Sequence, residues 1–169
     1  LEFNNVTATS VIGEVDQGYG LMQEVLNQAR LAVSAEALGA MEFLNATTLE
    51  YLKTREQFGV PIGSFQALQH RMVDCFGACE NTKSLVYRAV CTASEGSDDA
   101  EQSLLALKVM VGRAGKLIGG EAIQMHGGMG VTNELAVGHY VKRLMIINTL
   151  FGDADYHQQA FNQLLNKAA

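Results

Sequence analysis

The sequence has one proline, Pro61, no tryptophan and three cysteines among its 169 residues. Because proline interrupts helices, this scarcity leaves long stretches free to be helical. An odd number of cysteines, at Cys75, Cys79 and Cys91, does not indicate a disulfide framework. Cys75 and Cys79 share a helix face, but no further His or Cys pair completes a metal site. We therefore expect no metal, and expect these thiols to be buried as small apolar side chains.

The chain also lacks a basic run, a signal peptide and an apolar stretch long enough to cross a membrane. The net charge is -6 and the isoelectric point about 5.1, so nucleic acid is not expected as a partner. These absences predict a soluble cytoplasmic protein, or one of the mitochondrial matrix if the source is a eukaryote. The sequence begins at Leu1 rather than Met, which suggests a fragment or a processed product.

The sequence does contain helical periodicity. Apolar residues recur every three or four positions in four stretches, and a last helix is expected to end near Asn166. The four stretches are 22–53, 65–90, 104–125 and 135–147. About five helical segments joined by short loops predict an all-α, up-and-down four-helix-type bundle. Residues 1–13, with Val6, Val11 and Ile12 among polar residues, indicate an extended connector.

The breaks between these segments carry cap signals and glycines. Ser64 is expected to cap the second helix, and Thr132 or Asn133 the fourth. The carboxylates of residues 95–99 stand before the third helix, where the helix dipole favours them. The third helix contains several glycines, each costing about 1 kcal/mol relative to alanine, so close approach of a helix or ligand is expected there. These glycines are Gly112, Gly115, Gly119 and Gly120.

Two loops carry dense motifs. Residues 55–66 read R-E-Q-F-G-V-P-I-G-S-F-Q, and residues 124–130 read Q-M-H-G-G-M-G. The first resembles the R-x-x-F-G-x-x-I-x-x-F-Q signature of the acyl-CoA dehydrogenase C-terminal domain, and the second resembles that family's Q-x-x-G-G-x-G turn. They stand in the family's order, a helical hairpin apart. The resemblance implies a C-terminal helical domain over 18–169, preceded over 1–17 by the end of the family's middle β domain and a linker.

In this family, an acyl-CoA thioester loses an α-proton to a carboxylate and a β-hydride to FAD. The resemblance therefore implies FAD as cofactor, acyl-CoA as substrate and an electron-transfer flavoprotein as acceptor. It also implies a homodimer or homotetramer whose core this domain builds, or a hetero-oligomer with a second such subunit. Because the flavin ring of the family rests mainly on the middle β domain, the chain by itself is expected to be inactive.

The resemblance assigns residues to the FAD site of a neighbouring subunit. Arg55 matches the arginine that meets the FAD pyrophosphate, and a guanidinium fork suits two phosphate oxygens. The glycines allow the backbone to approach the cofactor, and His126 is expected to serve in packing. The matching residues are Arg55, Phe58 and Gln66 from the first motif, and Gln124, Gly127 and Gly128 from the second.

On the substrate side, the stretch 27–30 is similar to one that ends in an arginine of the CoA site, which assigns Arg30 to substrate binding. Most members carry their base as Glu in an E-G-T or E-G-S turn before the last helix. The matching carboxylate here is Asp155, without the Gly and Thr that follow. Members that place Glu on the first helix would have it at Ala29, which cannot be a base. An alternative is that Asp153 and Asp155 cap and charge a helix N-terminus.

Three alternatives to an active dehydrogenase domain stay open at this point. The chain could be a non-catalytic subunit supporting a Glu-bearing partner. It could belong to a relative with a non-CoA substrate, such as a nitroalkane-oxidase-like flavoenzyme. It could also be a purely structural oligomerisation module. The motifs at Arg55 and Gln124 argue against the third, because packing alone requires neither.

Overall fold

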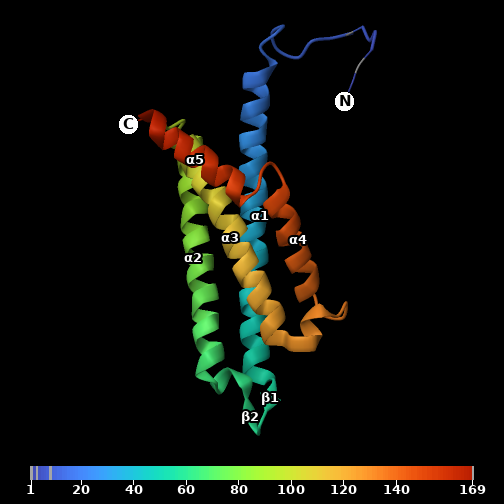
Figure 1. The fold of residues 1–169 in the computed structure, drawn as a ribbon, viewed down its shortest axis with the longest axis vertical. Helices are drawn as coiled ribbons and strands as arrows, with labels where there is room; N and C mark the ends of the chain where they lie inside the picture. Colours follow the sequence, from blue (N-terminus) through green and yellow to red (C-terminus); the bar gives the residue numbers. More distant parts are fainter. Residues whose placement is uncertain (1, 3, 8, 169) are drawn as a thin grey trace.

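The computed structural model describes residues 2, 4–7 and 9–168. Nearly all of the chain after residue 17 is helical (Figure 1). The α-helices are α1 (Gly18–Thr54), α2 (Gln66–Ser94), α3 (Ala100–His126), α4 (Val137–Thr149) and α5 (Ala154–Ala168). The short 3-10 helices are η1 (Ile62–Ser64) and η2 (Gly127–Val131), and a hairpin pairs β1 (Glu56–Gln57) with β2 (Val60–Pro61).

The helices form the predicted all-α, up-and-down bundle. α1, α2, α3 and α4 run alongside one another, and α5 crosses the bundle near the end opposite the hairpin (Figure 1). α3 is the central helix, since it packs against each of α1, α2, α4 and α5. Its apolar stripe is fully covered, with Leu107, Val111 and Ile118 at most 2% exposed. Burial of this stripe from all sides supplies the main driving force for the fold.

All three cysteines lie on α2, and the predicted burial is confirmed for Cys75 and Cys79. Cys75 and Cys79 are buried in the core and Cys91 is exposed. Burial raises the pKa of the Cys75 thiol to about 11, so it stays protonated and inert as a core side chain. In the described part of the chain, no group of His, Cys, Asp and Glu side chains has the arrangement of a metal site. Among the same residues, no helix combines the length and apolarity that a membrane span requires.

The structure explains two of the four glycines in α3, Gly112 and Gly119. A Cβ at Gly119 would lie 3.3 Å from Val141 of α4, whereas one at Gly115 would make only ordinary contacts, 3.5 Å from Met41 and 3.7 Å from Leu144. α4 therefore packs close to α3 along this face, as the sequence predicted. Gly112 faces Asn148, in the last turn of α4, and Ala154, the first residue of α5. Gly120 is different, because a Cβ there would meet nothing within 4 Å.

The predicted helix caps were wrong. The Ser64 hydroxyl donates to the carbonyl of Pro61 at 2.7 Å instead of capping α2, which begins after Phe65. Likewise, the Thr132 hydroxyl donates to the carbonyl of Met129 at 2.9 Å, and α4 begins only at Val137. In both places the hydroxyl bonds back within a 3-10 turn, a local competitor of capping.

The N-terminal stretch also differs from the extended connector that the sequence indicated. Its described residues form bends and a turn, without a strand. Val6, Val11 and Ile12 are each more than half exposed. A β-strand needs a partner for its backbone hydrogen bonds, and none lies beside these described residues.

Candidate functional site

The two sequence motifs meet at the hairpin end of the bundle. An open groove of about 490 Å³ lies between the end of α1, the hairpin and the end of α3. Arg55 reaches it from the first motif, and Gln124, Gly127 and Gly128 reach it from the second. We call this the hairpin groove; its other lining residues are Tyr51, Gln57, Ile62, Met125, His126, Met129 and Thr132.

The α3 end of the hairpin groove is shaped by its backbone. Gly127 has φ of +60°, a conformation that L side chains rarely adopt, and it ends α3. A Cβ added at Gly128 would meet nothing within 4 Å, so the backbone there is open to a ligand. His126 behaves as predicted, in packing: it is 3% exposed and stacks on Tyr51 with ring centroids 4.3 Å apart.

Phe58 and Gln66 do not line the hairpin groove. Phe58 is at the tip of the hairpin, in the two-residue loop between Gln57 and its partner Val60. Its φ is +57° and its side chain is 93% exposed. Gln66 is the first residue of α2 and is exposed. The structure thus brings four of the six expected cofactor residues together and leaves these two at the rim of the same end.

Arg30 lies toward the other end of the bundle. Its Nε donates to the carbonyl of Phe151 at 3.2 Å, and a terminal nitrogen donates to Asn27 at 2.8 Å. Phe151 belongs to the connection between α4 and α5, residues 150–153, which we call the α4–α5 turn. The expected substrate residue and the expected base are therefore neighbours: Arg30 holds the turn that leads into Asp155.

The two acidic residues after the turn have different surroundings. Asp153 caps α5, because its carboxylate accepts a hydrogen bond from the backbone N–H of Tyr156 at 2.8 Å. Asp155 is in the first turn of α5 and is exposed. Within the part of the chain that the structure describes, its carboxylate has no hydrogen-bond or ion-pair partner. The alternative therefore fits both residues: Asp153 caps α5, and Asp155 places a negative charge in its first turn. The exposed carboxylate of Asp155 is also accessible from outside the chain.

Two buried residues at the α4–α5 turn were not singled out in the sequence. Lys108 of α3 is 1% exposed and His157 of α5 is fully buried. Burial lowers the pKa of Lys108 to about 8, helped by the charge of Arg30, and burial also lowers that of His157. A signal for Lys108 did exist: it lies one turn after Leu104, on the apolar stripe of α3.

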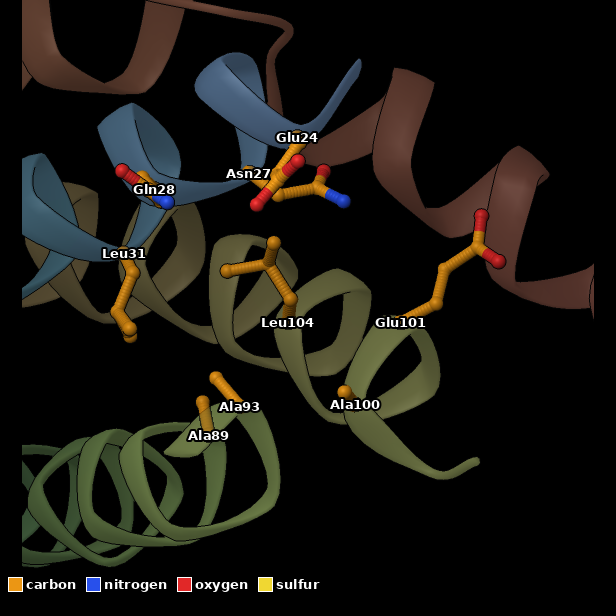
Figure 2. Close-up of a pocket in the computed structure, with 9 residues that line it drawn as sticks. All are labelled: Glu24, Asn27, Gln28, Leu31, Ala89, Ala93, Ala100, Glu101 and Leu104. Carbon is orange, nitrogen blue, oxygen red and sulfur yellow. The ribbon is translucent and has the colours of Figure 1, made fainter. Parts of the chain in front are cut away.

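A smaller hollow of about 230 Å³ lies between α1, the end of α2 and the start of α3 (Figure 2). Asn27 and Gln28 of α1 line one side, and Glu101 of α3 lines another. Small side chains of α2, Ala89 and Ala93, lie on a further side (Figure 2). The hollow includes part of the stretch that resembles the family's CoA site, but its carboxylates give it no evident affinity for an anionic ester.

Comparison with known proteins shows the family of the chain. The family described as "Acyl-CoA dehydrogenase, C-terminal domain" matches residues 16–163. A short-chain specific acyl-CoA dehydrogenase of Megasphaera elsdenii is 32% identical over 81% of this chain and 36% of its own length. The acyl-CoA dehydrogenase IpdE2 of Mycolicibacterium smegmatis is 36% identical over 80% of this chain and 40% of its own length.

The fold agrees as well. The structure of butyryl-CoA dehydrogenase from Megasphaera elsdenii superposes with a TM-score of 0.86 at 28% identity, over 90% of this chain and 40% of that one. The chain therefore belongs to the acyl-CoA dehydrogenase family and corresponds to its C-terminal domain. It spans well under half the length of the curated relatives it matches.

Proposed function

We propose that this chain is the C-terminal domain of an FAD-dependent enzyme that dehydrogenates acyl-CoA thioesters, and that it builds the enzyme's oligomer core. The observation that carries this proposal is the hairpin groove. Arg55 and Gln124 are 69 positions apart in the sequence, yet both line one groove. Packing of the bundle requires neither side chain there, since both are exposed.

The hairpin groove fits part of a dinucleotide cofactor. Arg55 offers an exposed guanidinium for a pyrophosphate, and Gln124 offers an amide that can donate and accept. The open backbone at Gly128 admits a flat group or a phosphate without side-chain obstruction. Phe58 and Gln66, at the rim, are proposed to contact the adenosine half. FAD would supply the hydride acceptor, and these residues would bind and orient it.

A further structural relative supports the proposal of flavin binding. "PigA with FAD and proline" superposes with a TM-score of 0.83 at 27% identity, over 89% of this chain. That title names FAD for PigA and names proline rather than an acyl-CoA. The acyl-CoA assignment of this chain therefore rests on the dehydrogenase relatives and on Arg30.

On the substrate side, we assign Arg30 to the acyl-CoA cavity and Asp155 to the abstraction of the α-proton. Asp155 is exposed on the helix end that the Arg30-bound turn leads into, so a substrate could reach it in the complete protein. An electron-transfer flavoprotein is the proposed acceptor. Residues 1–17 are proposed to be the end of the middle β domain and the linker.

A second candidate is a non-catalytic subunit of a hetero-oligomer. Asp155 is one methylene shorter than the family's Glu, and the Gly and Thr that follow that Glu are absent here. Two structural relatives carry titles that name pairs of proteins. They are "Tcur3481-Tcur3483 steroid ACAD G363A variant", with a TM-score of 0.81 at 32% identity, and the ChsE4-ChsE5 complex, with 0.84 at 26%.

The cofactor assignment is tested in the full-length protein with Arg55→Lys, which keeps the charge and removes the bidentate fork. FAD content after dialysis is measured by visible absorbance, with Arg113→Lys, an exposed change on α3, as the control. Loss of FAD is expected in Arg55→Lys alone. Equal FAD retention in both variants would contradict the assignment.

Asp155→Asn separates the two candidates. In an active dehydrogenase, anaerobic bleaching of the flavin by acyl-CoA should slow by orders of magnitude, because the proton acceptor is gone. Asp98→Asn, on the loop before α3, is the matched control. If the wild-type subunit alone does not bleach, and bleaching appears on co-expression with a Glu-bearing subunit, the non-catalytic reading holds.

A further inference from the structure

Lys108 is a charged side chain in the interior of the bundle. It is 1% exposed, and its ammonium nitrogen donates to two backbone carbonyls, of Ile147 at 3.0 Å and of Leu150 at 2.9 Å. These carbonyls belong to the last turn of α4 and the residue after it. In the described part of the chain, no carboxylate forms an ion pair with Lys108. Burying an ammonium group without a counter-ion is costly, so its presence requires a reason beyond core packing.

The carbonyl of the next residue, Phe151, is held by two further donors. Arg30 of α1 donates its Nε–H at 3.2 Å. The Nε2 of His157, on α5, lies 3.1 Å from the same oxygen. Because a carbonyl only accepts, Nε2 must carry the proton. Three helices other than α4 therefore send donors to consecutive carbonyls of one short turn.

The backbone of the turn is strained where these donors meet. Phe151 has φ of +59° and Gly152 has φ of +101°. A left-handed conformation costs a non-glycine residue about 1–3 kcal/mol and persists where the surrounding contacts over-determine it. The hydrogen bonds of the Phe151 carbonyl supply that over-determination. The direction in which the chain enters α5 thus depends on polar contacts rather than on the intrinsic preference of the turn.

The same face of α3 holds the turn a second time. Gly112 lies one helical turn after Lys108, and a Cβ there would collide with Asn148 Oδ1 and would lie 2.7 Å from the Ala154 side chain. α3 thus contacts both ends of the turn, with an ammonium group at one level and a bare backbone at the next. Together, Lys108 and Gly112 hold the turn close to α3 and fix its orientation relative to that helix.

We propose that Lys108 is a positioning residue: it fixes the carbonyls of the α4–α5 turn, and thereby fixes where the first turn of α5, with Asp155, stands toward the substrate. The expected effect on catalysis rests on the proposed function, in which Asp155 is the base. Lys108 itself touches no substrate. Its removal should let the turn relax from the strained conformation, which moves the α5 end while the FAD-binding end of the bundle stays in place.

The test uses the full-length holoenzyme with Lys108→Met, which keeps the length of the side chain and removes the donor. Lys116→Met, an exposed change two turns along α3, is the matched control. Amide hydrogen exchange of residues 149–157 reports the turn, and anaerobic flavin bleaching by an acyl-CoA reports the chemistry. Lys108→Arg, which keeps a cationic donor, tests rescue, and Lys108→Leu, which also lacks a donor, replaces the Met variant if the latter does not fold.

In Lys108→Met, exchange is expected to rise in residues 149–157 and not in α1 or α2. Bleaching at saturating substrate should slow between about tenfold and a hundredfold, the effect of a misplaced catalytic group, with FAD content unchanged and partial recovery in Lys108→Arg. Unchanged exchange at the turn, or a rise spread over all helices, overturns the proposal. If wild-type protein does not bleach, the proposed function fails instead, and the exchange pattern alone decides whether Lys108 holds the turn.

Discussion

The hairpin groove and the α4–α5 turn are built in opposite ways. The groove is open, its polar side chains Arg55 and Gln124 are exposed, and neither forms a hydrogen bond to another described side chain. The turn is closed, and donors from α1, α3 and α5 occupy its carbonyls. The polar side chains of the groove are therefore free to bind a ligand or another chain, whereas the carbonyls of the turn are already hydrogen-bonded within this chain.

This difference separates two tasks, binding a ligand and holding a segment of the chain in place. A residue that binds a cofactor needs hydrogen-bond donors that are not already used within the chain. A residue that positions another segment instead donates its hydrogen bonds to the backbone of that segment. The following predictions test that separation, in order of decreasing expected effect.

The largest effect concerns the charge buried at the turn. The pKa of Lys108 is about 8 in the folded chain and near its ordinary 10.5 when unfolded. Between these values the unfolded state binds more protons, so stability rises with pH there. At 1.36 kcal/mol per unit, the gain is roughly 3 kcal/mol. Denaturant unfolding at several pH values, wild type against Lys108→Met, isolates this contribution from other titrating groups. Parallel pH curves would mean that the ammonium group is not buried.

The next effect concerns the contact of α3 with the turn. Gly112→Ala places a methyl group against Asn148 and Ala154, and should lower the unfolding free energy by about 1–3 kcal/mol. Gly120→Ala, on the same helix, meets nothing within 4 Å and should raise it by about 0.5–1 kcal/mol. Thermal unfolding followed by circular dichroism measures both. Equal effects of the same sign would contradict the tight docking of the turn on α3.

A smaller effect concerns the hairpin. Phe58 and Gly59 both have positive φ in a two-residue loop, a geometry in which Asn-Gly is preferred. Phe58→Asn should therefore stabilise the chain by up to about 1 kcal/mol, and it should weaken FAD binding in the full-length protein by removing the exposed ring. Denaturant unfolding measures the change in stability, and titration with FAD measures the change in affinity. A gain in stability without loss of FAD affinity would remove Phe58 from the cofactor site.

The smallest effect concerns an exposed polar contact that contrasts with both regions. Arg143 of α4 donates two hydrogen bonds to Glu36 of α1, at 2.6 and 2.8 Å, and these lower the pKa of the Glu36 carboxyl. The contribution of this ion pair to the free energy of unfolding is present above the ordinary pKa of glutamate, and it is lost as the pH falls through the lowered pKa of Glu36. Because the pair is solvent-screened, Glu36→Gln should change stability far less than Gly112→Ala. If Glu36→Gln lowered the unfolding free energy as much as Gly112→Ala does, the exposed ion pair would contribute as much to stability as the buried contact, which would contradict this prediction.

The sequence predicted the bundle, its loops and the burial of Cys75 because those follow from local periodicity. Arg55 lies outside the α-helices as predicted, and Gln124 lies in the last turn of α3, within the stretch 104–125 that the sequence predicted to be helical. The family resemblance gave these two residues a common role. The sequence did not predict the hairpin at 56–61, whose paired strands are two residues each, too short for an alternating pattern. It also mistook Ser64 and Thr132 for caps, because a hydroxyl's choice between a helix N–H and a nearby carbonyl depends on where the chain turns.

What the sequence by itself determined is the set of helices, their apolar faces and the two motifs that identify the family, since these depend on residue type and spacing along the chain. The tertiary structure alone decided which residues meet. Lys108, Arg30 and His157 come from three separate helices, and their shared target is a backbone that no residue type encodes. Their convergence depends on the packing of α1, α3 and α5 around the end of α4, and carbonyl oxygens become specific partners only when that packing has fixed their positions.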